Sequence, residues 1–61
     1  MTPQVGEIWR ARVMGHNYLL VERVEGYRMV EEGKILFKTL RLETGVIELW
    51  VVCNDHFRRV A

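Results

Sequence analysis

The sequence predicts an all-β fold in which five short strands curl into a small barrel. Turn-forming residues recur at short intervals, and the runs between them are too short for typical helices and rich in β-branched and aromatic residues. A chain of 61 residues also supports no more than one hydrophobic core. We therefore expect residues 1–61 to form a single domain.

The first two strands are predicted at residues 5–13 and 18–24, joined by Met14-Gly15-His16-Asn17, which contains the Gly and Asn that a hairpin turn favours. Placing Val13 opposite Tyr18 sorts the side chains between two faces. One face resembles a core and carries Trp9, Ala11, Val13, Tyr18, Leu20 and Val24, with Glu22 as its charged member. The other mixes aliphatic and basic side chains: Ile8, Arg10, Arg12, Leu19, Val21 and Arg23.

The third and fourth strands are predicted at residues 34–42 and 46–53, with Glu43-Thr44-Gly45 as their turn. A loop over residues 25–33 precedes them, in which Met29 and Val30 could continue the sheet. The fourth strand is apolar on both sides, with Ile47, Leu49 and Val51 on one and Val46, Trp50 and Val52 on the other. A sheet with one wet face alternates apolar with polar residues. The outer face is therefore expected to be covered, by barrel closure, by a second copy or by another macromolecule.

The end of the chain predicts one helical turn at Asn54-Asp55-His56-Phe57, followed by a last strand at residues 58–61. This layout, together with Val5-Gly6-Glu7-Ile8-Trp9, Thr44-Gly45 and Phe57-Arg58-Arg59-Val60, resembles short SH3-like or KOW-like proteins of bacteria and their phages. The resemblance implies a five-stranded SH3-like barrel with a short 3₁₀ turn before the last strand. The acidic and aromatic groove motif of eukaryotic SH3 domains is absent, so the resemblance does not extend to binding of proline-rich peptides.

Composition favours a cytoplasmic protein. Cys53 is the single cysteine, so it forms no intramolecular disulfide, and a free thiol suits a reducing compartment. The N-terminus lacks the pattern of a signal peptide, and no apolar run approaches the roughly 20 residues that span a bilayer. The net charge of +1 gives no overall field that would attract nucleic acid.

No catalytic or metal-binding pattern stands out. The chain has no serine, and Asp55 is its single aspartate, which removes the usual hydrolase triads. A Cys53–His56 nucleophile pair is conceivable, but Cys53 ends an apolar strand and is expected to be a buried small hydrophobe. Cys53, Asp55 and His56 with His16 lack the spacing of known metal motifs. We therefore expect no enzyme activity, no metal and no cofactor.

These observations favour a non-enzymatic module that recognises a protein surface. Self-association is a related possibility, because a second copy would complete an undersized core. Trp9 is expected in the core, and Trp50 is the indole that we expect to be the more exposed. The residues predicted to contact a protein partner are Arg10, Arg12, Arg23, Tyr27, Leu49 and Trp50.

Binding of RNA or DNA is the alternative hypothesis. KOW-like barrels often bind nucleic acid, and arginines beside an exposed aromatic suit a single strand. Tyr18 or Tyr27 would supply the stacking ring, whereas ordinary ion pairs with the glutamates would argue against this function. The arginines concerned are Arg10, Arg12, Arg23, Arg28, Arg58 and Arg59.

Overall fold

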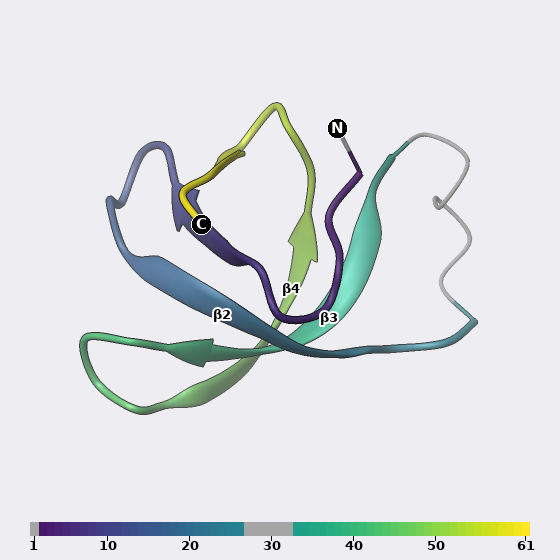
Figure 1. Cartoon of the computed structure of the whole chain (residues 1–61), viewed down its shortest axis with the longest axis horizontal. Helices are drawn as coiled ribbons and strands as arrows, with labels where there is room; N and C mark the ends of the chain where they lie inside the picture. The colour runs from purple at the N-terminus through teal and green to yellow at the C-terminus, as the bar shows by residue number, and fades with distance from the viewer. Residues whose placement is uncertain (1, 27–32) are drawn as a thin grey trace.

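The computed structural model describes residues 2–26 and 33–61, and its strands form one curled antiparallel sheet, a half-barrel (Figure 1). The strands follow the order β4-β3-β2-β1-β5 across the sheet. The predicted all-β, barrel-like fold is confirmed. Among the described residues, no helix is long and apolar enough to cross a membrane. The strands are β1 (Ile8–Ala11), β2 (Asn17–Arg23), β3 (Ile35–Arg41), β4 (Ile47–Val52) and β5 (Phe57–Arg59).

The first hairpin turns earlier than predicted. Gly15, with a φ of 76°, takes the left-handed position at the end of a four-residue loop, so β1 already stops at Ala11. Trp9 therefore pairs with Tyr18, the position that the sequence analysis gave to Val13. The placement of Val13 on the core face was wrong, because Val13 lies in the loop and is 94% exposed.

The shift in pairing leaves the two faces of the sheet as predicted. It amounts to four residues, and side chains alternate between faces with a period of two. Trp9 and Tyr18 are fully buried, as expected, whereas Val24 beyond a bulge in β2 is half-buried. Cys53 is also buried, as predicted. The core is made of Trp9, Ala11, Tyr18, Leu20, Ile35, Phe37, Thr39, Val52, Cys53 and Phe57.

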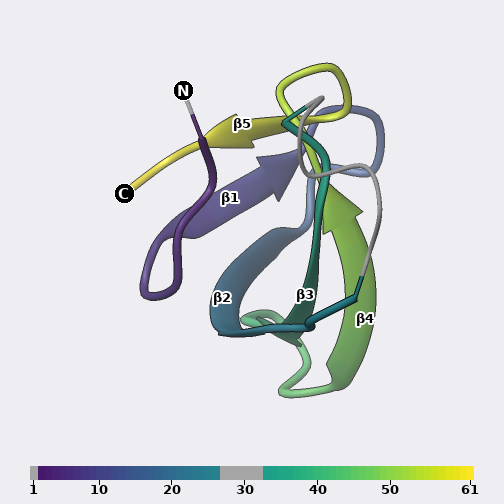
Figure 2. The same cartoon turned by 90° about the vertical axis from the view of Figure 1, so that its right-hand side faces the viewer.

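The outer face of β4 is exposed. Ile47 is 54% exposed and Leu49 is 61% exposed, while Val51 is half-buried. Barrel closure, one of the three covers expected for this face, does not reach it. The sheet stays open because β4 and β5 form its two edges, and Figure 2 shows the β1–β5 pair on one side of the molecule and β4 on the other.

The turn between β4 and β5 differs from the 3₁₀ turn that the resemblance implied. The Phe57 N–H donates to the Cys53 carbonyl at 3.0 Å, which links residues four positions apart, whereas a 3₁₀ turn links residues three apart. Phe57 then starts β5, one residue earlier than predicted, and its side chain enters the core. Met29 and Val30, which could have continued the sheet, lie outside the described residues.

Glu7 anchors the indole at the centre of the core. Trp9 Nε1 donates to Glu7 Oε1 at 3.0 Å, the Gln4 N–H donates to the same oxygen at 2.9 Å, and Arg59 Nη1 lies 3.4 Å from Glu7 Oε2. The Trp9 hydrogen bond lowers the pKa of Glu7 below its ordinary value of 4.5, and Gln4 and Arg59 act in the same direction against the effect of burial.

This pKa predicts a loss of stability in acid. Because the folded pKa of Glu7 is the lower one, its contribution is present above pH 4.5 and disappears as the pH falls through the folded value. Urea unfolding at pH 3 to 7 should show the free energy of unfolding falling below pH 4.5, and less steeply in Glu7→Gln. Glu25→Gln, at an exposed position, is the control. Equal acid slopes in Glu7→Gln and the unsubstituted chain would contradict the assignment.

Candidate functional site

The two open edges of the sheet differ in how well they are protected. Within the described part of the chain, β5 pairs with β1 alone and β4 with β3 alone. β5 is three residues long and carries Arg58 and Arg59, and short charged edges resist pairing with another strand. β4 has six residues and one charged side chain, that of Glu48. It is therefore the edge that remains open to strand pairing.

The free backbone groups of β4 belong to its outward-facing residues. The Arg41 N–H donates to the Val46 carbonyl at 2.9 Å, which identifies this pair as a hydrogen-bonded one. Hydrogen-bonded pairs alternate along an antiparallel ladder, so the even-numbered residues of β4 bond to β3. Ile47, Leu49 and Val51 consequently direct their N–H and C=O groups to the free edge, and their side chains lie on the exposed outer face.

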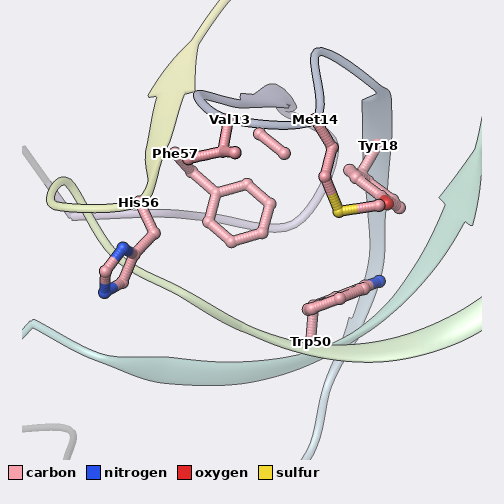
Figure 3. Close-up of a pocket in the computed structure, with 7 residues that line it drawn as sticks. Val13, Met14, Tyr18, Trp50, His56 and Phe57 are labelled. Carbon is pink, nitrogen blue, oxygen red and sulfur yellow. The ribbon is translucent and has the colours of Figure 1, made fainter.

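A small apolar pocket lies on the concave side, between β4 and the β1–β5 pair. Its volume is about 130 Å³, and Figure 3 shows Phe57 and Met14 extending from one side toward Trp50 on the other. Three rings stand close together in its wall: the centroids of Tyr18 and Trp50 are 5.8 Å apart, and Phe57 lies 6.0 Å from Tyr18 and 6.2 Å from Trp50. Ala11, Val13 and His56 complete the lining.

An ion pair fixes the indole that lines this pocket. Arg41 Nη2 donates to both carboxylate oxygens of Glu48 at 2.9 Å, and Trp50 Nε1 donates to Glu48 Oε1 at 3.2 Å. Burial opposes the charge on Arg41, but Glu48 and the neighbouring Tyr18 together outweigh burial and raise the pKa of Arg41 above its ordinary value. The Arg41 guanidinium also lies 5.7 Å from the centroid of the Tyr18 ring. The single charge of β4 is thus already engaged within the chain.

Comparison with protein families, with curated proteins and with solved structures finds no match. The function must therefore be inferred from the geometry of the chain itself. Over residues 2–26 and 33–61, no three side chains of His, Cys, Asp or Glu are grouped so that they could hold a metal ion. The pocket and the β4 edge are the features on which a proposal can rest.

The predicted protein-binding residues are only partly brought together. Leu49 and Trp50 are neighbours on β4 that face opposite sides of the sheet, Leu49 outward and Trp50 toward the pocket. Arg10 is exposed on β1. Arg23 is exposed at the end of β2, whereas the other end of β2, at Asn17 to Leu19, pairs with β1. Tyr27 lies outside the described residues.

The predicted arginine stripe is also divided. Arg10 lies directly opposite Arg58 across the β1–β5 pairing, and both are exposed. Arg12 follows β1, and its Nε donates to the Asn54 carbonyl at 3.2 Å. Arg59 instead forms an ion pair with Glu7.

One of the two aromatic residues offered for base stacking is buried. Tyr18 is fully buried, so the prediction that it could stack on a base was wrong. Its pairing partner Trp9 occupies the same face, which the curled sheet turns inward. Tyr27, the other candidate ring, lies outside the described part of the chain, as does Arg28.

The sequence analysis missed the pocket. Its walls come from β1, the first hairpin loop, β2, β4 and β5, which only the curl of the sheet brings together. One feature of the sequence could have indicated it. Val13 and Met14 are two apolar residues in a hairpin loop, where polar residues are usual, and both line the pocket.

Proposed function

We propose that the chain is a non-enzymatic protein-binding module that adds an extended segment of a partner protein to the free edge of β4. The observation that carries this proposal is the character of that edge: β4 is six residues long, and Ile47 and Leu49 are more than half exposed beside its free backbone groups. Strand addition takes its affinity from main-chain hydrogen bonds and its specificity from alternate side chains.

The energetics favour a partner at this edge. A partner strand would bond the N–H and C=O groups of Ile47, Leu49 and Val51 and shield their side chains from water. Complete burial of a Leu or Ile side chain contributes about 1.5–3 kcal/mol, and roughly half of that remains to be gained at Ile47 and Leu49. The charge of Glu48 adds little cost to the docking of a partner strand, because Arg41 already binds its carboxylate.

We further propose that the half-barrel is of the SH3-like, KOW-like type found in short proteins of bacteria and their phages, and that it acts in the cytoplasm. The strand order β4-β3-β2-β1-β5 and the resemblance of the sequence support the first part. The free, buried thiol of Cys53 supports the second.

Selection from a displayed library of random ten-residue peptides tests the proposed function. We expect enrichment of peptides with several consecutive apolar residues. The reason is that side chains on both faces of an added strand would lie beside apolar side chains of β4. Light scattering measures whether the mass of the chain in solution rises with its concentration, over about 10 µM to 1 mM, where weak dimers form. A rise would show that a second copy competes for the edge. Peptides that bind equally well when the β4 edge is changed would contradict strand addition.

Nucleic-acid binding is a second candidate, supported by the pair Arg10 and Arg58. Like charges directly opposite each other on neighbouring strands destabilise a sheet. Among the described residues neither of these arginines has a carboxylate in ion-pair range, whereas Glu22 binds Lys38 and Glu48 binds Arg41. An anionic ligand on this face would relieve the repulsion. The candidate stands second because no exposed stacking ring accompanies the pair in the described part of the chain.

The double variant Arg10→Ser/Arg58→Ser separates the two candidates. If the arginines bind phosphates, a labelled 20-nucleotide single strand of RNA or DNA should bind at 50 mM salt, and log K should fall with log salt by about 0.7 for each phosphate contacted, values typical of such complexes. The double variant should lose that binding while keeping peptide binding. No binding of either strand at low salt would exclude the second candidate.

A further inference from the structure

We infer that the pocket beside Trp50 sets the specificity of the added strand, by accepting one uncharged side chain of Leu, Met or Phe size from a foreign protein. This inference rests on the proposed strand addition at β4. It goes beyond that function because it assigns a second surface, on the concave face, and states which partner residue enters it.

The alternation of side chains places one partner residue at the pocket. In an added strand, residues opposite Ile47, Leu49 and Val51 share their outward face, and the residues between them point to the concave side. The partner residue opposite Trp50 therefore points inward, beside the indole that lines the pocket. A single side chain at a fixed position is thus presented to the pocket by the backbone pairing itself.

The size and lining of the pocket define that side chain. A volume of about 130 Å³ is close to that of an engineered cavity of about 150 Å³ that holds benzene, so an isobutyl group or a phenyl ring fits and an indole does not. The wall is formed by the rings of Tyr18, Trp50 and Phe57 with the side chain of Met14. A carboxylate entering this lining would lose its hydration, and His56 is the one lining residue whose side chain could pair with it.

A cationic side chain is disfavoured for a different reason. Aromatic rings attract cations, but the Arg41 guanidinium already lies 5.7 Å from the centroid of the Tyr18 ring. The Tyr18 ring thus already has a cation beside it, and the Glu48 carboxylate that could pair with a new one is bound to Arg41.

If a second copy paired its own β4 with this edge, the residue that it placed at the pocket would fit poorly. In a two-fold antiparallel pair of β4 strands, a register centred on Leu49 places the partner copy's Glu48 position opposite Trp50. A register centred on Trp50 brings two indoles together, and one centred on Glu48 sets like charges opposite each other. The first two registers thus put a charge or an oversized ring at the pocket, whereas registers centred on Glu48 or Val51 put Val46 or Val52 opposite Trp50. Valine is smaller than the Leu, Met or Phe side chain that the pocket accommodates, so the geometry favours a foreign segment as the occupant.

A peptide series tests the assignment. The probe is the tightest ten-residue peptide from the displayed library, with the position that faces Trp50 varied by synthesis and affinity measured by fluorescence anisotropy. Replacing Leu by Ala there should weaken binding about 50-fold, from the loss of three buried carbons. Lys, Glu and Trp should be rejected at this position and tolerated better at the outward positions. If the position that faces Trp50 shows no such preference for Leu over Ala, Lys, Glu and Trp, the inference is overturned.

Pocket variants supply the matched test on the protein. Ala11→Val narrows the pocket from β1 and should weaken the Leu peptide about tenfold while leaving the Ala peptide unchanged. Trp50→Phe enlarges it and should improve binding of the Trp peptide, which keeps the test decisive if Ala11→Val fails to fold. If Leu49→Lys weakens binding strongly but neither pocket variant alters the size preference, the pocket assignment fails and strand addition stands. If Leu49→Lys has no effect, or no peptide is enriched at all, strand addition fails and the pocket assignment falls with it.

Discussion

Replacing Trp9 by Ala should leave the chain largely unfolded at 25 °C. Trp9 is fully buried, pairs with Tyr18 and donates its Nε1–H to Glu7. Truncation of a buried Trp typically costs about 3–5 kcal/mol. A core of this size rarely provides more than about 3–5 kcal/mol in total. Far-UV circular dichroism and urea unfolding measure the outcome, with Trp50 as the remaining fluorescent reporter.

Trp50→Ala is the matched control for this prediction. Trp50 is half-buried and packs against the core from one side, so its loss should lower the free energy of unfolding by less and leave a cooperative transition. Trp9→Phe should fall between the two variants. A Trp9→Ala chain that unfolds cooperatively within about 1 kcal/mol of the unsubstituted chain, a change ordinary for surface positions, would show that Trp9 is not the centre of the core.

Replacing Leu49 by Lys should weaken peptide binding about 30-fold without affecting the fold. Leu49 is 61% exposed on the outer face, so a charge there should change the free energy of unfolding by no more than about 0.5 kcal/mol. In the complex, however, the side chain would lie against an outward-facing partner residue, and an anchor of this kind contributes about 2 kcal/mol. Lysine on an edge strand is also a common device against strand pairing.

Val5→Lys provides a matched control, since Val5 is similarly exposed, at 57%, in the turn before β1. It should bind the selected peptide as the unsubstituted chain does. The double variant Ile47→Lys/Leu49→Lys should show no measurable binding. Equal binding by Val5→Lys and Leu49→Lys at matched thermal stability would remove β4 from the site.

The parts of the fold that depend on local patterns were predictable from the sequence. The fourth strand was expected at residues 46–53 and lies at Ile47–Val52, because a Thr-Gly turn and an apolar run define it. The burial of Trp9 followed from its place on an apolar face. The first hairpin was misplaced because Gly15 was taken as an inner turn residue, whereas it ends the loop with a left-handed conformation.

The candidate site was predictable only at β4. Leu49 and Trp50 were singled out because both faces of their strand are apolar, and the structure places them at an open edge. The pocket depends on how far the sheet curls, which brings Met14 and Phe57 to Trp50 and which no local pattern encodes. The division of the arginines depends on pairing across β1 and β5, where Arg58 meets Arg10 and Arg59 turns to Glu7.

Amide hydrogen exchange at the β4 edge tests the central proposal most directly. The exchange rates of Ile47, Leu49 and Val51 are compared by NMR with and without the selected peptide at about 100 times its dissociation constant. Strand addition predicts that these three amides, which face the free edge, slow by roughly 100-fold, while the amides of β5 (Phe57–Arg59) show no comparable protection. Protection at β5 with unchanged exchange at Ile47, Leu49 and Val51 would contradict it.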